Sequence, residues 1–150
     1  MAIPASLNQK NSLTLGFTPM DDIHEEFDML IAQALSCPDA NLLCQIELLK
    51  AHLYSHFGAE DRWMRETNFP AQDCHINEHA AVLQSAEDVY QLVSQGNLSI
   101  GRSFVSELQA WFPGHADYLD SALAHWMCKS RLGGKPIVLH SRKPAMTMVD

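Results

Sequence analysis

Four segments of this chain carry apolar residues at alternating steps of three and four, which is the spacing of one buried α-helix face. They span residues 20–34, 42–63, 75–93 and about 100–127. Strand-like periodicity appears only over residues 137–139. Four long amphipathic helices with short connections pack best as an antiparallel up-down-up-down arrangement. The sequence therefore predicts an all-α fold, a four-helix bundle.

Turn-forming residues separate these segments. Thr18 followed by Pro19 predicts the start of the first helix, with the Thr18 hydroxyl as cap and Pro19 at the first helical position. The Cys-Pro-Asp stretch at residues 37–39 ends this helix and starts the next, and Gly96 ends the third. We divide the chain into an N-terminal arm, the bundle and a C-terminal tail, over residues 1–17, 18–130 and 131–150.

Composition narrows the classes of function. The 150 residues include 10 Lys and Arg against 18 Asp and Glu, a net charge of −8, so the surface repels phosphate backbones and anionic headgroups. No apolar run approaches the roughly 20 residues that span a bilayer. The N-terminus is polar where a secretory signal is apolar. We expect a cytoplasmic protein that binds neither nucleic acid nor membranes.

The cysteine pattern excludes two further classes. No two of the four cysteines form a CxxC pair, which argues against a zinc knuckle and against a thioredoxin-like redox pair. Without an export signal a disulfide framework is not expected either. We expect all four to be reduced, small core residues. They are Cys37, Cys44, Cys74 and Cys128.

Histidine or a carboxylate occupies core positions on every predicted helix, and an aspartate follows on the fourth. The seven residues are His24, His56, Glu60, His75, His79, His115 and Asp120. An unpaired buried carboxylate is unfavourable, and an unpaired imidazole leaves a ring nitrogen unsatisfied. A lone buried histidine is usually a satisfied core residue. Seven such groups from four helices instead indicate bound cations, which imidazole nitrogens and carboxylate oxygens coordinate.

The spacing and the donor types constrain the metal. Side chains four residues apart on a helix lie about 5–6 Å apart, so His75 and His79 can share one ion, and His56 and Glu60 can serve one ion or two. Five imidazoles and two carboxylates exceed the donors of one ion, so two ions are implied. A mixed nitrogen and oxygen shell favours iron or manganese. Because histidine outnumbers carboxylate, unlike in ferritin-like sites, the site suits reversible O2 binding better than oxygen activation.

Five stretches of the sequence are similar to motifs of the hemerythrin family, specifically its bacterial single-domain type. They are MDDIHEEF at residues 20–27, HFGAE at 56–60, FP at 69–70, HINEH at 75–79, and WFPGH at 111–115 continued to Asp120. The resemblance covers residues 18–128, and all seven ligand positions of the family are filled.

The resemblance implies a role for each of the seven residues. One iron ion would be bound by three histidines, a second by two, and both carboxylates would bridge the pair. The first group is His75, His79 and His115, the second is His24 and His56, and the bridging residues are Glu60 and Asp120. The implied cofactor is two iron ions, Fe2+ or Fe3+, with a bridging oxo or hydroxo group. The implied ligand is O2, bound at an open position of the two-histidine iron.

The last motif departs from the family pattern, which commonly reads Trp-Leu-x-x-His-Ile. Here Phe112 and Ala116 replace the leucine and isoleucine, which redistributes bulk around the expected O2 pocket. Pro113 lacks a backbone N–H and should kink the fourth helix just before its ligand. Asp120 stands five residues after His115, so the two do not share one α-helical stripe. The placement of Asp120 therefore follows from the resemblance alone.

Aromatic residues beside the predicted ligands could form a dry wall that keeps water from the oxygen-binding iron. Together with Ala116, the expected O2 pocket comprises Phe27, Phe57, Trp111 and Phe112. The alternative is ordinary core packing, and the two interpretations are compatible.

Other polar residues are assigned no ligand role. His52 and His125 are expected at the surface or as outer partners of ligands. Four acidic residues flank the ligands and are expected to face solvent. They are Glu25, Glu26, Asp61 and Glu78.

The leading functional hypothesis is a non-heme di-iron protein that reversibly binds O2 for carriage, storage or sensing, without turnover. The alternatives are a di-iron enzyme acting on peroxide or nitric oxide, an iron-donating repair protein, a sensory input module and a metal-free structural bundle. An enzyme is disfavoured because no second redox centre is visible. We expect a monomer or weak oligomer, with a basic tail that docks on the bundle or on an unidentified protein partner.

Overall fold

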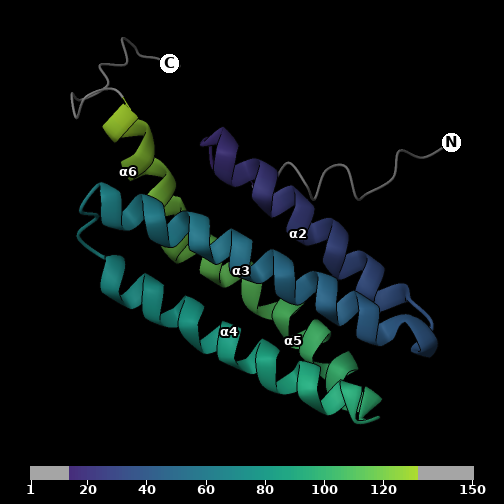
Figure 1. Cartoon of the computed structure of the whole chain (residues 1–150). Coiled ribbons are helices and arrows are strands. Elements are labelled where there is room, and N and C mark those ends of the chain that lie inside the picture. The colour runs from purple at the N-terminus through teal and green to yellow at the C-terminus, as the bar shows by residue number, and fades with distance from the viewer. Residues whose placement is uncertain (1–13, 132–150) are drawn as a thin grey trace, which may run out of the picture.

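Residues 14–131 are described by a computed structural model, and they are almost entirely helical. The elements are α2 (Thr18–Ser36), η1 (Asp39–Asn41), α3 (Leu42–Glu66), α4 (Gln72–Ser94), α5 (Leu98–His115), η2 (Ala116–Asp120) and α6 (Ser121–Arg131). No strand occurs in this part of the chain. Figure 1 shows the long helices running side by side. The predicted all-α fold is confirmed.

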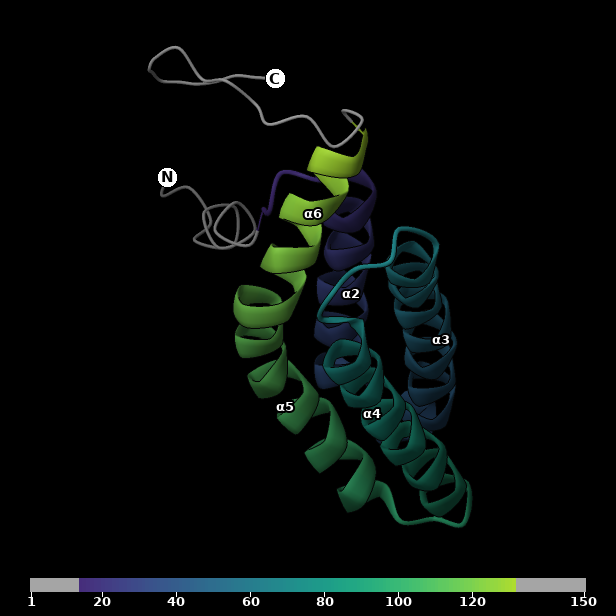
Figure 2. The ribbon, with the colours of Figure 1, turned by 90° about the vertical axis from the view of Figure 1, so that its left-hand side faces the viewer.

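The helices form a closed ring of neighbours. α2 packs against α3 and α5, and α4 packs against the same two helices. The short η1 links α2 to α3, while α5, η2 and α6 together make the fourth and longest arm of the bundle (Figure 2). This neighbour pattern is that of an up-down-up-down four-helix bundle, in which each helix returns beside the preceding one.

The start of α2 differs from the prediction. Thr18 is already helical, the cap position is Phe17, and no side chain caps the helix there. Asp21 instead fixes the segment before the helix, because its carboxylate accepts hydrogen bonds from the backbone N–H groups of Leu15 and Gly16, at 2.8 and 3.1 Å. An acidic residue in the first turn also interacts favourably with the helix dipole. The predicted Thr18 cap is therefore wrong.

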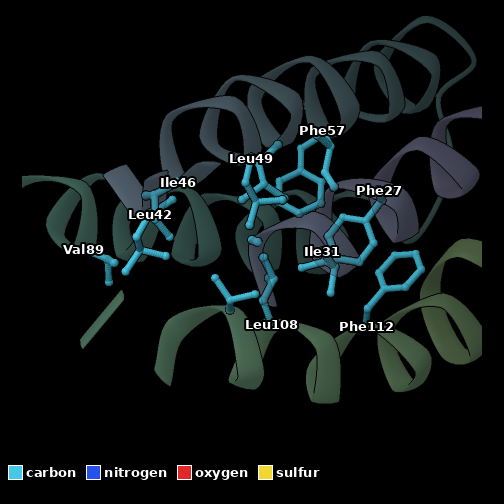
Figure 3. Close-up of a cluster of buried hydrophobic side chains, with 14 of the residues drawn as sticks. Phe27, Ile31, Leu42, Ile46, Leu49, Phe57, Val89, Leu108 and Phe112 are labelled. Atoms are coloured by element: carbon cyan, nitrogen blue, oxygen red, sulfur yellow. The ribbon is translucent and has the colours of Figure 1, made fainter. Parts of the chain in front are cut away.

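The interior contains two apolar clusters, one on either side of the seven predicted ligand residues. The larger one lies between all four arms, and Figure 3 shows Phe27, Phe57 and Phe112 at one end of it, away from Leu42 and Val89. The smaller one joins the start of α2 and the end of α3 to the first two turns of α6. Its buried members are Phe17, Met20, Met64, Phe69, Leu123, Ala124 and Met127.

The expectation that the cysteines are core residues is wrong. Cys44 and Cys74 are exposed, while Cys37 and Cys128 are half-buried, and all four are free thiols. Cys37 and Cys128 pack at the edges of the two apolar clusters, while Cys44 and Cys74 are exposed on α3 and α4. Residues 132–150 of the expected tail, which include the strand-like residues 137–139, lie outside the described residues. Within residues 14–131, no helix is long and apolar enough to cross a bilayer.

Candidate metal centre

The seven predicted ligand residues converge at one place in the bundle interior, and none is more than 3% exposed. The elements that supply them are α2 for one, α3 for two, α4 for two, the end of α5 for one and the end of η2 for one. Their donor atoms form two groups, within each of which all the donors lie within 4.8 Å of one another. One group is Glu60, His75, His79, His115 and Asp120, and the other is His24, His56, Glu60 and Asp120.

Residues four apart on regular helices explain most of this convergence. His56 and Glu60 are one α-helical turn apart on α3, with Nε2 and Oε2 separated by 3.1 Å. His75 and His79 are one turn apart on α4, and their ring centroids lie 4.5 Å apart. Periodicity alone therefore places these four side chains on the inner faces of their helices.

Asp120 reaches the site through an irregular turn. Residues 116–120 form a π-helical turn, in which the backbone N–H of Ser121 donates to the carbonyl of Ala116, five residues earlier. Such a turn holds one more residue than an α-helical turn, so a residue five positions on returns to the same face. His115 Nε2 and Asp120 Oδ1 consequently lie 3.1 Å apart. Pro113 lies inside α5 just before this turn, and Figure 2 shows the direction of the fourth arm changing between α5 and α6.

The carboxylate of Glu60 divides its two oxygens between the two groups. Oε2 lies 3.1 Å from His56 Nε2 and 3.4 Å from His24 Nε2. Oε1 faces the other way and lies 3.3 Å from His79 Nε2 and 3.5 Å from His75 Nε2. Glu60 thus has one oxygen available for each group of histidines.

Asp120 has the same arrangement. Its Oδ2 lies 3.1 Å from His24 Nε2. Its Oδ1 lies 3.0 Å from His75 Nε2 and 3.1 Å from His115 Nε2. Two carboxylates that each present one oxygen to each side are the geometry that bridging ligands of a metal pair require.

The donor set fits cations because many of its polar atoms lie close to opposite charge but make no hydrogen bond of acceptable geometry. Among residues 14–131, the buried side-chain atoms without a hydrogen-bond partner belong to this cluster, apart from Gln45 Oε1. They are both ring nitrogens of His24 and His75, Glu60 Oε1 and both carboxylate oxygens of Asp120. Buried polar groups normally have partners, and a concentration of unpaired donors and acceptors indicates a ligand or ion.

Two histidines are fixed from behind by carboxylates. His79 Nδ1 donates to Asp61 Oδ1 and His115 Nδ1 donates to Glu78 Oε1, each at 2.7 Å. In their neutral form both rings then present a lone pair at Nε2, and these two Nε2 atoms lie only 3.2 Å apart. Two lone pairs at this distance repel unless a cation or a proton lies between them. Carboxylates that orient ligand histidines in this way are typical of metal sites.

The expectation that Asp61 and Glu78 face solvent is therefore wrong. Each is only half-buried, yet its carboxylate points toward a histidine of the neighbouring helix. The signal available in the sequence is that each directly neighbours a predicted ligand, Glu60 or His79. Helical spacing places such neighbours off the inner face and does not show that they reach across to the next helix.

His52 and His125 have different fates. His52 is buried, and its Nε2 lies 3.2 Å from His56 Nδ1, so it is an outer partner of a predicted ligand. Burial, together with the nearby His56 and His24, lowers the pKa of His52 to about 4. His125 is exposed on α6 and is not part of the site.

The cluster has a strong affinity for positive charge. Burial by itself lowers the pKa of His24 and His75, but contacts with Asp120 and Glu60 outweigh it and raise both to about 9. Burial likewise favours the neutral form of Glu60 and Asp120, and for Asp120 the charge of Glu60 adds to this. The surrounding histidines nevertheless hold the pKa of both carboxyls well below its usual range. The carboxylates therefore stay ionised and attract protons or metal ions.

The predicted pocket residues border the two groups of histidines unequally. Phe112 packs edge-on against His24 at 4.9 Å and contacts Phe27 at 4.4 Å, measured between ring centroids. Phe57 stacks on His79 at 4.0 Å, and Trp111 lies 4.4 Å from His115. Phe27, Phe57, Phe112 and Ala116 are fully buried, whereas Trp111 is half-buried. Phe27 and Phe112 thus cover the two-histidine side, and Phe57 and Trp111 cover the three-histidine side.

A curated protein named bacteriohemerythrin, from Ralstonia nicotianae, is 31% identical to this chain over 118 residues, which span 79% of this chain and 86% of the relative. The chain belongs to the hemerythrin family. No protein-family model matches the sequence. No solved structure matches it either.

Membership of the hemerythrin family agrees with the four-helix fold and with a buried cluster that can hold metal. The ligand motifs of the hemerythrin family do not include the residues that contact the ligand histidines from outside the cluster. Asp61, Glu78 and His52 each hold the outer nitrogen of a cluster histidine. They become visible only when neighbouring helices, or successive turns of one helix, are placed together.

Proposed function

We propose that the cluster binds two iron ions with a bridging oxo or hydroxo group, and that the protein binds O2 reversibly. The observation that carries this proposal is the division of oxygens in both carboxylates. Glu60 and Asp120 each present one oxygen to His24 and the other to His75. A single ion could not be coordinated by all four oxygens in this arrangement, whereas two neighbouring ions could be.

The donor count differs between the two ions. An ion held by the three-histidine group would have five protein donors, and an ion held by the other group would have four. With one shared bridge, an ion that prefers six donors would be fully coordinated in the first group and would have room for O2 in the second. We assign His75, His79 and His115 to the first ion and His24 and His56 to the second, with Glu60 and Asp120 bridging.

When bound, the iron pair supplies the electrons that hold O2 and recovers them on release. The chain keeps this exchange reversible by excluding water from the open side. Phe27 and Phe112 are 1% and 2% exposed and lie against His56 and His24, so that side of the site is dry. A dry wall limits the protons and nucleophiles that would drive irreversible oxidation.

A cycle of reduction and oxygenation tests the proposal. The iron-loaded protein is reduced without air, exposed to air, and then returned to an oxygen-free atmosphere while its visible spectrum is recorded. A charge-transfer band that forms in air and disappears on deoxygenation supports O2 binding. Immediate irreversible oxidation, with turnover of added peroxide or nitric oxide, overturns it in favour of a di-iron enzyme.

The ligand assignment is tested by His75→Ala, with His125→Ala as a matched control on the exposed face of α6. We expect the first variant to lose iron and stability together, because metal binding contributes to folding free energy. The control should keep both. A fully iron-loaded and normally stable His75→Ala protein would contradict the assignment.

A further inference from the structure

His52 lies on α3 one turn before His56 and belongs to neither group of donors. His52 is only 6% exposed, and a buried imidazole needs partners for its ring nitrogens. Its Nε2 lies 3.2 Å from His56 Nδ1, and the two rings meet edge to face, with centroids 5.1 Å apart. Phe27 packs on the same ring, with a centroid separation of 6.0 Å. The ring of His52 is thus held in place against His56.

The hydrogen bonds determine which nitrogen carries each proton. His56 Nε2 faces Glu60 Oε2 at 3.1 Å inside the cluster, so a metal there requires the lone pair at Nε2. The proton of His56 is then on Nδ1, and it is donated to His52 Nε2. His52 is consequently neutral, with its own proton on Nδ1, which lies 3.4 Å from Glu26 Oε1. The Glu26 side chain is 57% exposed, so this chain of contacts ends at the surface.

The two halves of the cluster differ in the kind of outer partner. His79 and His115 each donate to a carboxylate, at 2.7 Å, whereas His56 donates to a neutral imidazole, at 3.2 Å. A carboxylate partner raises the basicity of a ligand histidine and stabilises the higher oxidation state of its metal. A neutral partner fixes the ring in the same way but adds less electron density.

We infer that His52 is a positioning residue for the two-histidine ion, which orients His56 and keeps it a weaker electron donor than His79 and His115. This inference rests on the proposed function, since it concerns the ion to which we assign O2 binding. It explains why the chain buries a histidine that is not itself a donor beside His56. It also gives the two ions unequal surroundings beyond their unequal donor counts.

Three variants test the inference. His52→Leu removes the acceptor of the His56 Nδ1 proton and fills the space with an apolar side chain of similar size. His52→Gln restores one acceptor for His56 and one donor for Glu26. His125→Leu makes the same change at an exposed position on α6. Each protein is titrated with Fe2+ and, separately, with Co2+ against a competing chelator, and the reduction potential of the iron-loaded form is measured.

We expect His52→Leu to bind one of the two ions about 10- to 100-fold more weakly and to raise the reduction potential, because His56 loses its acceptor. His52→Gln should stay within about threefold of the parent protein in affinity, as expected when an outer hydrogen bond is kept. His125→Leu should leave both quantities unchanged. Thermal unfolding of the metal-free variants distinguishes this role from a purely structural one. If His52 were only structural, His52→Leu and His52→Gln would both unfold at lower temperature than the parent protein.

Two results overturn the inference. One is a His52→Leu protein that binds both ions and has the potential of the parent. The other is a His52→Gln protein as impaired as His52→Leu. A parent protein that binds Co2+ but not Fe2+ overturns the proposed function while the His52 comparison still stands. A parent protein that binds neither ion overturns both.

Discussion

His115 and Asp120 stand five residues apart in the sequence, yet His115 Nε2 and Asp120 Oδ1 are separated by 3.1 Å. On a regular α-helix, five residues turn the chain by about 140° beyond a full revolution, which would place the two side chains on different faces. The π-helical turn over residues 116–120 accommodates the additional residue and brings Asp120 back over His115. The aspartate bridges both groups of donors because of this single irregular turn.

Deleting Tyr118 tests this relationship, because its side chain is 79% exposed and makes no part of the interior. The deletion leaves three residues between Ala116 and Ser121, the number spanned by an α-helical hydrogen bond. We expect the variant to fold with similar helix content, to keep Leu123 and Met127 in the core, and to bind both iron ions. Far-ultraviolet circular dichroism and iron analysis measure these outcomes.

The matched control is deletion of Ser106, which is exposed in the regular part of α5. There the missing residue rotates Val105 by about 100° relative to Leu108 and His115, so one of the two sides must leave the core. This variant should lose helix content and iron. Equal damage from the two deletions would contradict the interpretation of residues 116–120 as a one-residue insertion.

The sequence predicts those features that depend on helical periodicity. The four arms of the bundle and the inward positions of His24, His56, Glu60 and His79 follow from steps of three and four. Asp120 does not follow, because periodicity assumes a constant number of residues per turn, and nothing in Ala-Asp-Tyr-Leu-Asp itself indicates a wider one. The family resemblance placed it where local reasoning could not.

Contacts between helices are the other gap. Asp61 and Glu78 were expected in solvent because they stand off the inner stripe of their own helices, whereas each reaches a histidine on the adjacent helix. The cysteines show the opposite error, since a small apolar residue was assumed to be buried without a place on any stripe. Sequence patterns describe each helix against an average interior and do not describe its particular neighbours.

Removal of the Asp61 carboxylate should weaken metal binding without removing a ligand. In Asp61→Ala, His79 loses the acceptor that holds its Nδ1–H at 2.7 Å, so the ring can rotate or change tautomer. We expect iron affinity to fall about 10- to 100-fold. Asp61→Asn keeps a neutral acceptor for His79, so its iron affinity should lie between those of Asp61→Ala and the parent protein. Competition with a chelator measures the affinities.

Glu47→Ala is the control for Asp61→Ala, because Glu47 is an exposed acid on the same helix. It changes the net charge of the protein by the same amount and should leave iron affinity unaltered. A similar loss in both variants would indicate that overall charge, and not the contact with His79, determines binding.

Chelated, metal-free protein should be less stable at alkaline pH. The pKa of His24 and of His75 is about 9 in the folded state, above the ordinary value of 6.5, so folding favours their protonated forms. The resulting stabilisation is fully present below pH 6.5 and is lost as the pH rises through 9. Each unit of pKa shift corresponds to about 1.4 kcal/mol, so the loss should be easily measured by urea unfolding at pH 6 and at pH 9.5.

Iron-loaded protein provides the comparison for the metal-free measurement. There metal ions replace the protons as the partners of Glu60 and Asp120, so stability should fall much less between the two pH values. The pKa values of the Glu60 and Asp120 carboxyls are lowered, so their effect on stability has the opposite pH dependence. Their contribution is lost only as the pH falls below about 4, the ordinary pKa of a carboxyl group. A metal-free protein equally stable at pH 6 and pH 9.5 would show that His24 and His75 are not protonated in the fold.

Phe112 provides a test of the dry wall on the two-histidine side. It is 2% exposed, lies edge-on to His24 at 4.9 Å and contacts Phe27 at 4.4 Å. Phe112→Ala leaves a cavity beside His24 and should lower the free energy of unfolding by about 3–5 kcal/mol. Water that enters this cavity should accelerate irreversible oxidation of the oxygenated iron centre, which is followed as decay of its visible spectrum in air.

Phe112→Leu, which keeps the site apolar, should lie much closer to the parent in both stability and oxidation rate. If Phe112→Ala oxidised no faster than Phe112→Leu, the aromatic ring would be ordinary core packing and the wall would have no role in retaining O2.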